Sequence, residues 1–152
     1  MKKLAIVTTH PIQYYAPVFK LLHERNKISV KVYYTWGEKA LVKYDPGFGQ
    51  QVTWDIPLLE DYPYEWVLNT SNDPGTHHFN GIVNPDLAEQ ISTWQPDAVL
   101  FFGWAYQGHL KAIKYFKNKT PVLFRGDSTL LDETGGLKSI VKSIFTDNHI
   151  AK

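Results

Sequence analysis

Short apolar runs alternate with segments of helical periodicity along most of the chain, and this alternation predicts a parallel sheet covered by helices. Runs rich in β-branched and aromatic residues indicate strands at residues 4–8, 28–34, 98–102 and 121–125. The run at 4–8 is almost entirely apolar, as expected for a strand that is buried on both faces. Residues 52–56 alternate apolar and polar side chains and indicate one more strand.

Apolar residues at the spacing of helical turns mark four segments that we expect to be helices, each with one buried face. Their stripes are Tyr15, Val18, Phe19, Leu22 and His23; Leu87, Ala88, Ile91 and Trp94; Tyr106, Leu110, Ile113 and Phe116; and Leu137, Ile140, Val141 and Ile144. Pro17 fits the first helix because it falls in the first turn, where its missing N–H is not needed. Asn84 and Pro85 are expected to cap and to begin the second helix.

This order of elements predicts an α/β fold, in which a Rossmann-like parallel sheet with helices on both faces forms a single domain over residues 1–145. Residues 146–152 are expected to form a short polar tail. The stretch 35–85 is irregular and, outside 52–56, is expected to form long loops. In such folds ligands bind beyond the carboxyl ends of the strands. We therefore expect a site at the loops 8–14, 102–107 and 125–129.

The composition fits a globular domain and excludes several classes of function. A formal net charge of +1 lacks the excess of positive charge expected of a nucleic-acid-binding protein. The absence of cysteine excludes a disulfide scaffold, a thiolate metal site and a cysteine nucleophile. The apolar start of the chain breaks at Thr8, too soon for a signal peptide, and no run reaches the roughly 18 apolar residues that span a bilayer. We therefore expect a cytoplasmic protein.

The first candidate loop contains His10, Gln13 and Tyr14, directly after the first expected strand. It brings an imidazole, an amide and a phenol to the start of a helix, a combination suited to an anion or to sugar hydroxyls. The alternative is a capped turn in which His10 makes one structural hydrogen bond. No Gly-x-Gly-x-x-Gly fingerprint is present, so a dinucleotide is not expected at this loop.

The other two candidate loops combine glycine, an aromatic residue and charged residues. Gly103 would let a ligand approach the backbone, and Trp104 offers a flat face to a sugar ring, although it could instead pack over the edge of the sheet. Arg125 is suited to gripping phosphate or carboxylate, and Asp127, followed by Ser128, could accept a proton from a hydroxyl. The alternative for this loop is an internal ion pair between Arg125 and Asp127 that caps the next helix.

Two further features carry weaker signals. His77 and His78, near Asp73, could be metal ligands, but adjacent side chains rarely converge on one ion without a fixed turn. A pair of loop histidines is therefore expected, with no metal site and no cofactor. The stripe at 137–145 is flanked by lysines and could lie on an anionic membrane surface, but packing against the core is its expected role.

The strand-end loops resemble those of the N-terminal domain of bacterial glycosyltransferases of the GT-B type, family 4 (group 1). The likeness covers the chain to about residue 143 and is carried by residues 10–17 (HPIQYYAP), 96–100 (PDAVL), 103–104 (GW) and 124–129 (FRGDST). The resemblance implies a domain that binds the acceptor and forms one wall of the active-site cleft. The residues that it implies at the substrates are His10, Gln13, Tyr14, Gly103, Trp104, Arg125 and Ser128, with Asp127 as the catalytic group.

The same resemblance implies a retaining, metal-independent transferase of polysaccharide biosynthesis, which moves a hexosyl group from a nucleotide sugar to a glycan or lipid-linked acceptor. In this family a C-terminal domain holds the donor, and the chain is expected to lack that domain. We therefore expect negligible activity from the chain alone, because transfer requires both substrates to be aligned in one pocket. The alternative is a non-catalytic module that binds a glycan or a partner and is completed by a separate donor-binding chain or by self-association. Peripheral contact with the inner face of the membrane and a flavodoxin-like binder of a small nucleotide are further alternatives.

Overall fold

The described part of the chain is built around a five-stranded parallel sheet. The computed structural model describes residues 1–38, 44–45, 50–51 and 57–125. The strands of the sheet are β1 (Lys3–Thr8), β2 (Ser29–Tyr34), β5 (Tyr64–Trp66), β6 (Ala98–Phe102) and β7 (Val122–Arg125). They pair in parallel in the order β5-β2-β1-β6-β7, with β1 at the centre. Two short strands, β3 (Tyr44–Asp45) and β4 (Gln50–Gln51), form a separate antiparallel pair.

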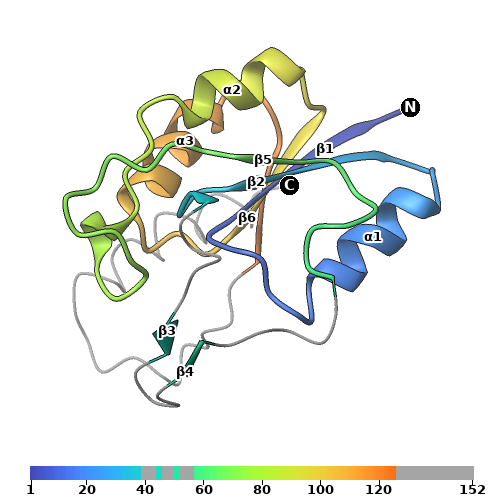
Figure 1. Cartoon of the computed structure of the whole chain (residues 1–152). Helices are drawn as coiled ribbons and strands as arrows, with labels where there is room; N and C mark the ends of the chain where they lie inside the picture. The colour runs from blue at the N-terminus through green and yellow to red at the C-terminus, as the bar shows by residue number, and fades with distance from the viewer. Residues whose placement is uncertain (39–43, 46–49, 52–56, 126–152) are drawn as a thin grey trace, which may run out of the picture.

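Helices lie on both faces of the sheet (Figure 1). One face carries α1 (Ala16–Glu24), and the other carries α2 (Leu87–Trp94) and α3 (Gln107–Phe116). This arrangement confirms the predicted α/β, Rossmann-like fold, in which crossover helices connect parallel strands. Within the part of the chain that the structure describes, no helix has the length and apolar character needed to traverse a lipid bilayer.

Both faces of the central strands are buried, because successive side chains of a strand point to opposite sides of the sheet. In β1, Ala5 and Val7 join the core beneath α2 and α3, whereas Ile6 joins the core beneath α1. The neighbouring tyrosines of β2 divide in the same way, since Tyr33 belongs to the first core and Tyr34 to the second. The covering of both faces explains why the first strand is almost continuously apolar.

The expected strands at 4–8, 28–34, 98–102 and 121–125 are confirmed, with ends that differ by one residue at most. The first three expected helices are also confirmed, but Val18 and His23, which were expected on the buried face of the first helix, are exposed. The expected strand at 52–56 and the expected helix with its stripe at 137–144 lie outside the described residues. The prediction of long loops over 35–85 is wrong in part, because the described residues of this stretch contain the short strands β3 and β4, the edge strand β5 and the short 3₁₀ helix η2 (Phe79–Gly81).

The predicted start of the second helix is corrected by the structure. Helix α2 begins at Leu87 with Asp86 as its N-cap, and Asp86 makes no side-chain capping hydrogen bond. Asn84 is instead buried in the interior, where its amide donates to the carbonyl oxygens of Thr35 at 2.8 Å and Leu68 at 2.9 Å. The side chain satisfies backbone carbonyls next to β2 and β5 rather than the N–H groups of the following helix.

Candidate functional site

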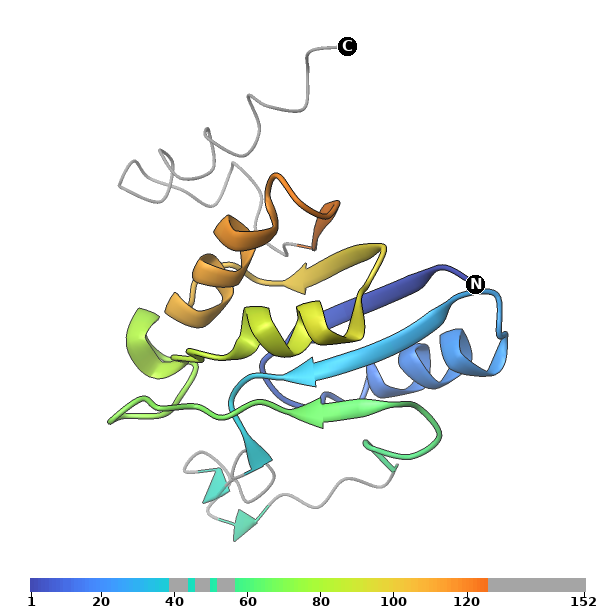
Figure 2. The ribbon, with the colours of Figure 1, turned by 90° about the horizontal axis from the view of Figure 1, so that it is seen from above.

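The sheet reverses its direction of growth at β1 and β6. From β1 the chain moves outward through β2 to β5, and it then returns to the other side of β1 and moves outward through β6 to β7. Figure 2 shows the arrowheads of β2, β5 and β6 pointing the same way, so the carboxyl ends of the strands share one edge. Loops that leave two neighbouring strands in opposite directions at such a point open a crevice, which is where open α/β sheets bind ligands. The loops after β1 and β6 are two of the three predicted from the sequence.

The loop after β1 holds His10 against a second aromatic residue. Nδ1 of His10 lies 2.9 Å from the Thr9 hydroxyl, and its ring meets the Trp36 indole edge-on, with centroids 5.2 Å apart and planes at 81°. The Trp36 backbone N–H donates to the Thr9 carbonyl oxygen at 2.8 Å, which ties the loop after β2 to the loop after β1. Trp36 was missed in the sequence analysis, although its place two residues beyond the end of β2 was a usable signal.

Gln13 and Tyr14 lie farther along the same loop and are exposed. The Ile12 carbonyl oxygen accepts from the backbone N–H groups of Tyr15 and Ala16, both at 3.0 Å, and so turns the chain into α1. The Tyr14 ring meets the Tyr15 ring edge-on at 4.8 Å. Both predicted side chains are therefore accessible to a ligand, but they lie on the rim and not within a buried pocket.

The loop after β6 turns on Gly103, whose φ of +84° is a left-handed conformation that other residues adopt only with strain. A side chain at this position would meet no atom within 4 Å, so open space lies beside the backbone here. Trp104, the next residue, is half-buried and packs against the core beneath α2 and α3. The structure therefore supports the packed interpretation of Trp104, and the exposed part of its ring is what remains for a ligand.

Arg125 ends β7 and stacks on two aromatic rings, Tyr15 at the start of α1 and Phe102 at the end of β6. Its guanidinium carbon lies 4.6 Å from the centroid of the Tyr15 ring and 5.4 Å from that of Phe102. The same guanidinium donates a hydrogen bond to the Tyr15 hydroxyl. These contacts keep the Arg125 side chain on the α1 side of the sheet, at the rim. Asp127, Ser128 and the alternative ion pair between Arg125 and Asp127 lie outside the described residues.

A fully buried histidine lies beneath the two loops. His109 of α3 has Nδ1 at 3.0 Å from the Gly103 carbonyl oxygen, and Nε2 at 2.7 Å from the Thr35 hydroxyl. Because a carbonyl oxygen can only accept, Nδ1 carries the hydrogen and Nε2 of the neutral ring is an acceptor. The single hydrogen of the Thr35 hydroxyl is therefore shared between Nε2 and the Thr8 carbonyl oxygen, which lies 3.1 Å from the hydroxyl oxygen. Burial lowers the pKa of His109 to about 4, partly opposed by the hydrogen bond to Gly103. The ring is therefore neutral at pH 7 and joins α3 to the loop after β6.

Thr35 extends this connection to the two central strands. Its backbone N–H donates to the Thr8 carbonyl oxygen at 3.0 Å, which links the ends of β1 and β2. Thr8, Thr35 and His109 are all buried, so these hydrogen bonds are protected from water. His109 was missed in the sequence analysis, although it completes the helical spacing of Tyr106, Ile113 and Phe116, and a polar residue on a buried stripe is a detectable signal.

Close packing of α3 completes this framework. Gly108 precedes His109, and its backbone N–H donates to the Ile82 carbonyl oxygen at 2.9 Å. A side chain at Gly108 would come within 2.4 Å of the Asn84 side-chain oxygen, so only glycine allows α3 to approach this closely. The strand-end loops therefore stand on a hydrogen-bonded base formed by residues of β1 and α3 and by Thr35 and Gly103, which directly follow β2 and β6.

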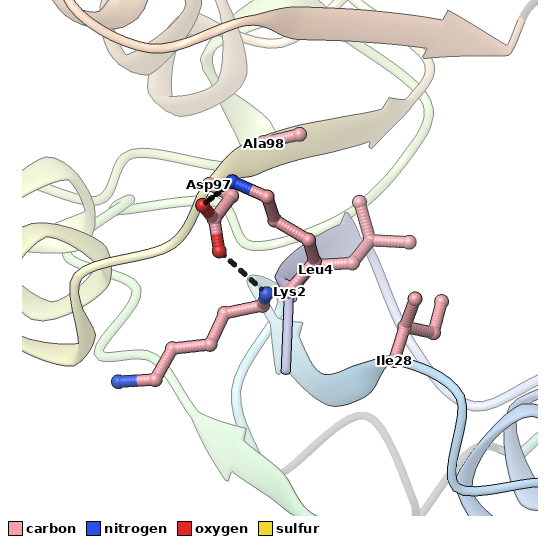
Figure 3. A pocket seen from close by; sticks show the side chains of 6 residues that line it. Lys2, Leu4, Ile28, Asp97 and Ala98 are labelled. Atoms are coloured by element: carbon pink, nitrogen blue, oxygen red, sulfur yellow. Dashed lines mark hydrogen bonds and ion pairs between the residues drawn. The ribbon is translucent and has the colours of Figure 1, made fainter.

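A separate hollow of about 330 Å³ lies at the opposite end of the sheet, where β1 and β6 begin (Figure 3). Asp97 in this hollow accepts from Lys2 Nζ at 2.6 Å and from the backbone N–H of Lys3 at 2.8 Å. These interactions lower the pKa of Asp97 and raise the pKa of Lys2. Because the carboxylate is already satisfied by these neighbours, the hollow is best explained as an anchor for the start of β1.

The comparisons with known proteins leave the family open. No protein-family model matches the chain, and searches among curated proteins and solved structures found no significant match. The likeness to family 4 glycosyltransferases therefore stands on the strand-end motifs alone, and the function has to be argued from the site.

Proposed function

We propose that this chain is the acceptor-binding domain of a retaining, metal-independent glycosyltransferase of the GT-B type. In the proposed reaction a hexosyl group passes from a nucleotide sugar to a glycan or lipid-linked acceptor. One observation carries the proposal: the His10 loop after β1 and the Gly103 loop after β6 flank the point at which the sheet reverses its order. These two loops also contain five of the eight site residues that the resemblance implies: His10, Gln13, Tyr14, Gly103 and Trp104.

The chemistry of the crevice suits a carbohydrate. Sugars present hydroxyl groups to polar side chains and C–H faces to aromatic rings, and His10 with Trp36 supplies both kinds of contact at one place. Gln13 and Tyr14 add an exposed amide and an exposed phenol on the rim. The open space beside Gly103 allows a ring to approach the backbone of the second loop.

Arg125 is proposed to neutralise phosphate at the third loop. Its stack on Tyr15 and Phe102 holds a permanent positive charge at the same edge of the sheet. Asp127 is proposed to orient or deprotonate the acceptor hydroxyl, with Ser128 as a neighbouring contact. Alignment of two substrates can lower a barrier by about 7–11 kcal/mol, so the chain without a donor-binding domain is expected to show negligible turnover of nucleotide sugars.

Saturation-transfer NMR with a panel of oligosaccharides and lipid-linked saccharides tests acceptor binding directly. The proposal expects saturable binding that His10→Ala and Trp36→Ala each weaken by about tenfold, since loss of a buried or stacked contact at a site costs about 1–2 kcal/mol. His23→Ala, an exposed histidine on α1 away from these loops, is the matched control and should bind like the parent. If the parent binds no saccharide, or if both loop variants bind as tightly as the parent, the proposal is wrong.

A separate observation favours the alternative of a partner-binding module. Val18 and Leu21 on α1 are 49% and 47% exposed, and Tyr14, which precedes the helix at the same spacing, is 63% exposed. Such an apolar stripe is a candidate surface for a second chain. Sedimentation velocity of the parent and of the double variant Val18→Glu/Leu21→Glu tests it: a concentration-dependent dimer that the variant abolishes supports self-association. A parent that is monomeric at all concentrations would contradict self-association through this stripe.

A further inference from the structure

Three potential metal ligands converge on the loop that follows β5. Nε2 of His77 and Nε2 of His78 lie 3.2 Å and 3.3 Å from the same carboxylate oxygen of Asp73. One ligand atom from each of the three residues lies within 4.8 Å of the others. Nε2 of His78 also lies 3.0 Å from the Asp73 backbone carbonyl oxygen, and the two adjacent imidazole rings have centroids 4.5 Å apart. A bound ion would replace the hydrogens through which the two Nε2 atoms now contact Asp73.

A fixed turn makes this convergence possible, which is the condition that the sequence alone could not establish. Asn69 holds the two sides of the loop together, because its amide donates to the Gly81 carbonyl oxygen and its side-chain oxygen accepts from the backbone N–H of Val83, both at 2.9 Å. The Ser71 hydroxyl donates to the Asn80 carbonyl oxygen at 2.6 Å and accepts from the Asp73 N–H at 3.2 Å. The backbone that presents the three ligands is therefore organised before any ion binds.

Two glycines hold the turn in this shape. The Gly75 backbone N–H donates to the Gly81 carbonyl oxygen at 3.0 Å across the loop. A side chain at Gly81 would come within 2.0 Å of the Gly75 carbonyl oxygen, and one at Gly75 would come within 2.4 Å of the His77 ring. Position 81 therefore requires glycine, because the backbone of Gly75 stands in the way, whereas a side chain at Gly75 would only have to turn the exposed His77 ring aside.

We propose that Asp73, His77 and His78 form a binding site for a zinc-like divalent transition metal ion. Ligand atoms at about 2.0–2.1 Å from a tetrahedral ion are separated by roughly 3.3 Å, and both imidazole-to-carboxylate distances are close to this value. Two imidazoles and one carboxylate suit zinc, whereas magnesium prefers oxygen ligands alone. Three protein ligands leave one position open for water or an anionic oxygen ligand.

The proposed metal site goes beyond the acceptor-binding function and does not rest on it. The loop abuts the start of α3, since the Tyr106 hydroxyl lies 3.4 Å from the Thr76 carbonyl oxygen and the Gln107 amide lies 3.5 Å from the Asn80 side-chain oxygen. Tyr106 also packs edge-on against His109, with ring centroids 5.4 Å apart. A bound ion would thus stiffen a loop that contacts Tyr106 and Gln107 at the start of α3, next to the buried His109.

Metal titration of the purified, tag-free chain tests the proposal. Cobalt absorption spectroscopy, with zinc in competition, should show one equivalent bound, and magnesium should not compete. Asp73→Asn, His77→Ala and His78→Ala should each weaken zinc binding by at least about tenfold, while His23→Ala should bind like the parent. All these residues but His78 are exposed, so far-UV circular dichroism should show a folded chain in every variant.

A further variant separates a built site from a chance pair of surface histidines. Gly81→Ala keeps all three ligands but forces the turn apart, and it should lose zinc affinity to a similar extent with the sheet still folded. Equal zinc binding by the parent and by the triple ligand variant would overturn the proposal. Absence of cobalt or zinc binding by the parent at neutral pH would overturn it as well, without bearing on saccharide binding at the crevice.

Discussion

The Thr35 hydroxyl at the end of β2 lies 2.7 Å from Nε2 of His109 on α3, and both side chains are fully buried. Through this one hydrogen bond the helix that follows β6 is connected to the centre of the sheet. The other ring nitrogen of His109 reaches the Gly103 carbonyl oxygen, so the same side chain sets the position of the glycine turn. A neutral, buried histidine thus supports the strand-end loops from below.

Replacement of His109 should lower stability more than replacement of any exposed histidine. His109→Phe keeps a ring of similar size but leaves the Gly103 carbonyl oxygen and the Thr35 hydroxyl without this partner, which costs about 1–3 kcal/mol. Urea denaturation followed by circular dichroism measures the change. The control His23→Ala, on the exposed side of α1, should stay within about 0.5 kcal/mol of the parent; an equal effect of both variants would contradict the assigned role.

The low pKa of His109 predicts acid sensitivity. Between its ordinary value of 6.5 and the folded value of about 4, the unfolded chain binds a proton that the folded chain does not. The free energy of unfolding should therefore fall as the pH falls through this window, by about 3 kcal/mol from this group alone. Denaturant titrations at pH 7 and pH 4 measure the loss, and the His109→Phe variant should show a flatter dependence. A parallel pH dependence in parent and variant would contradict the prediction.

Alkaline conditions should destabilise the fold through the tyrosines of β2. Burial raises the pKa of Tyr34, helped by its hydrogen bond with Tyr62, and burial also raises the pKa of Tyr33. Above the ordinary value of 10 the unfolded chain releases protons that the folded chain keeps, so stability should fall as the pH rises past it. Absorbance titration near the tyrosinate band should show both phenols ionising only as the chain unfolds. Full, reversible ionisation of all tyrosines in the folded protein would refute this.

Two glycines of the framework should respond differently to the same substitution. Gly103→Ala introduces backbone strain at φ +84° but meets open space, so a loss of about 1–2 kcal/mol is expected. Gly108→Ala drives a methyl group into the Asn84 side chain and should cost more, because α3 or Asn84 must shift within a packed interior. Denaturation midpoints of the two variants give the order directly. The reverse order would contradict close packing of α3 against Asn84.

Two substitutions distinguish the stacking of Arg125 on aromatic rings from its hydrogen bond to Tyr15. Arg125→Lys retains the positive charge but loses the planar stack on Tyr15 and Phe102, which should cost about 0.5–1 kcal/mol of stability at this exposed position. Tyr15→Phe removes the hydroxyl that accepts from Arg125 but keeps the ring, and its effect should be smaller. Thermal unfolding of the two variants side by side distinguishes stacking from hydrogen bonding; a larger effect of Tyr15→Phe would assign the main role to the hydroxyl.

Long, strongly patterned elements could be predicted, whereas short or unpatterned ones could not. Strands β1, β2, β6 and β7 and the three helices follow from apolar runs and helical spacing, because these patterns report burial on one or both faces. Strand β5 is only three residues long and has one exposed residue, so it carries no such pattern. Asn84 has the residue type of a helix cap, but its amide donates to the carbonyl oxygens of Thr35 and Leu68, which are far from it in the sequence.

Some parts of the candidate site could likewise be predicted from the sequence, and others could not. Strand ends carry the His10 and Gly103 loops, and the rule for open α/β sheets was enough to select them. Trp36 and His109 join these loops only through contacts across the sheet, over separations that no local pattern reports. The packed position of Trp104 likewise depends on which core lies below it.

The sequence alone determines that this protein is a parallel sheet covered by helices, with polar loops at the strand ends. It does so because burial of strands and helices imposes a periodicity on the apolar residues that can be detected locally. Only the tertiary structure decided which of those polar groups meet. The neutral bridge from Thr35 through His109 to Gly103 arises from long-range packing, and the turn that presents Asp73, His77 and His78 is closed by hydrogen bonds from Asn69 to residues 81 and 83. Distances of this kind depend on where several elements come to rest together, and no single segment encodes them.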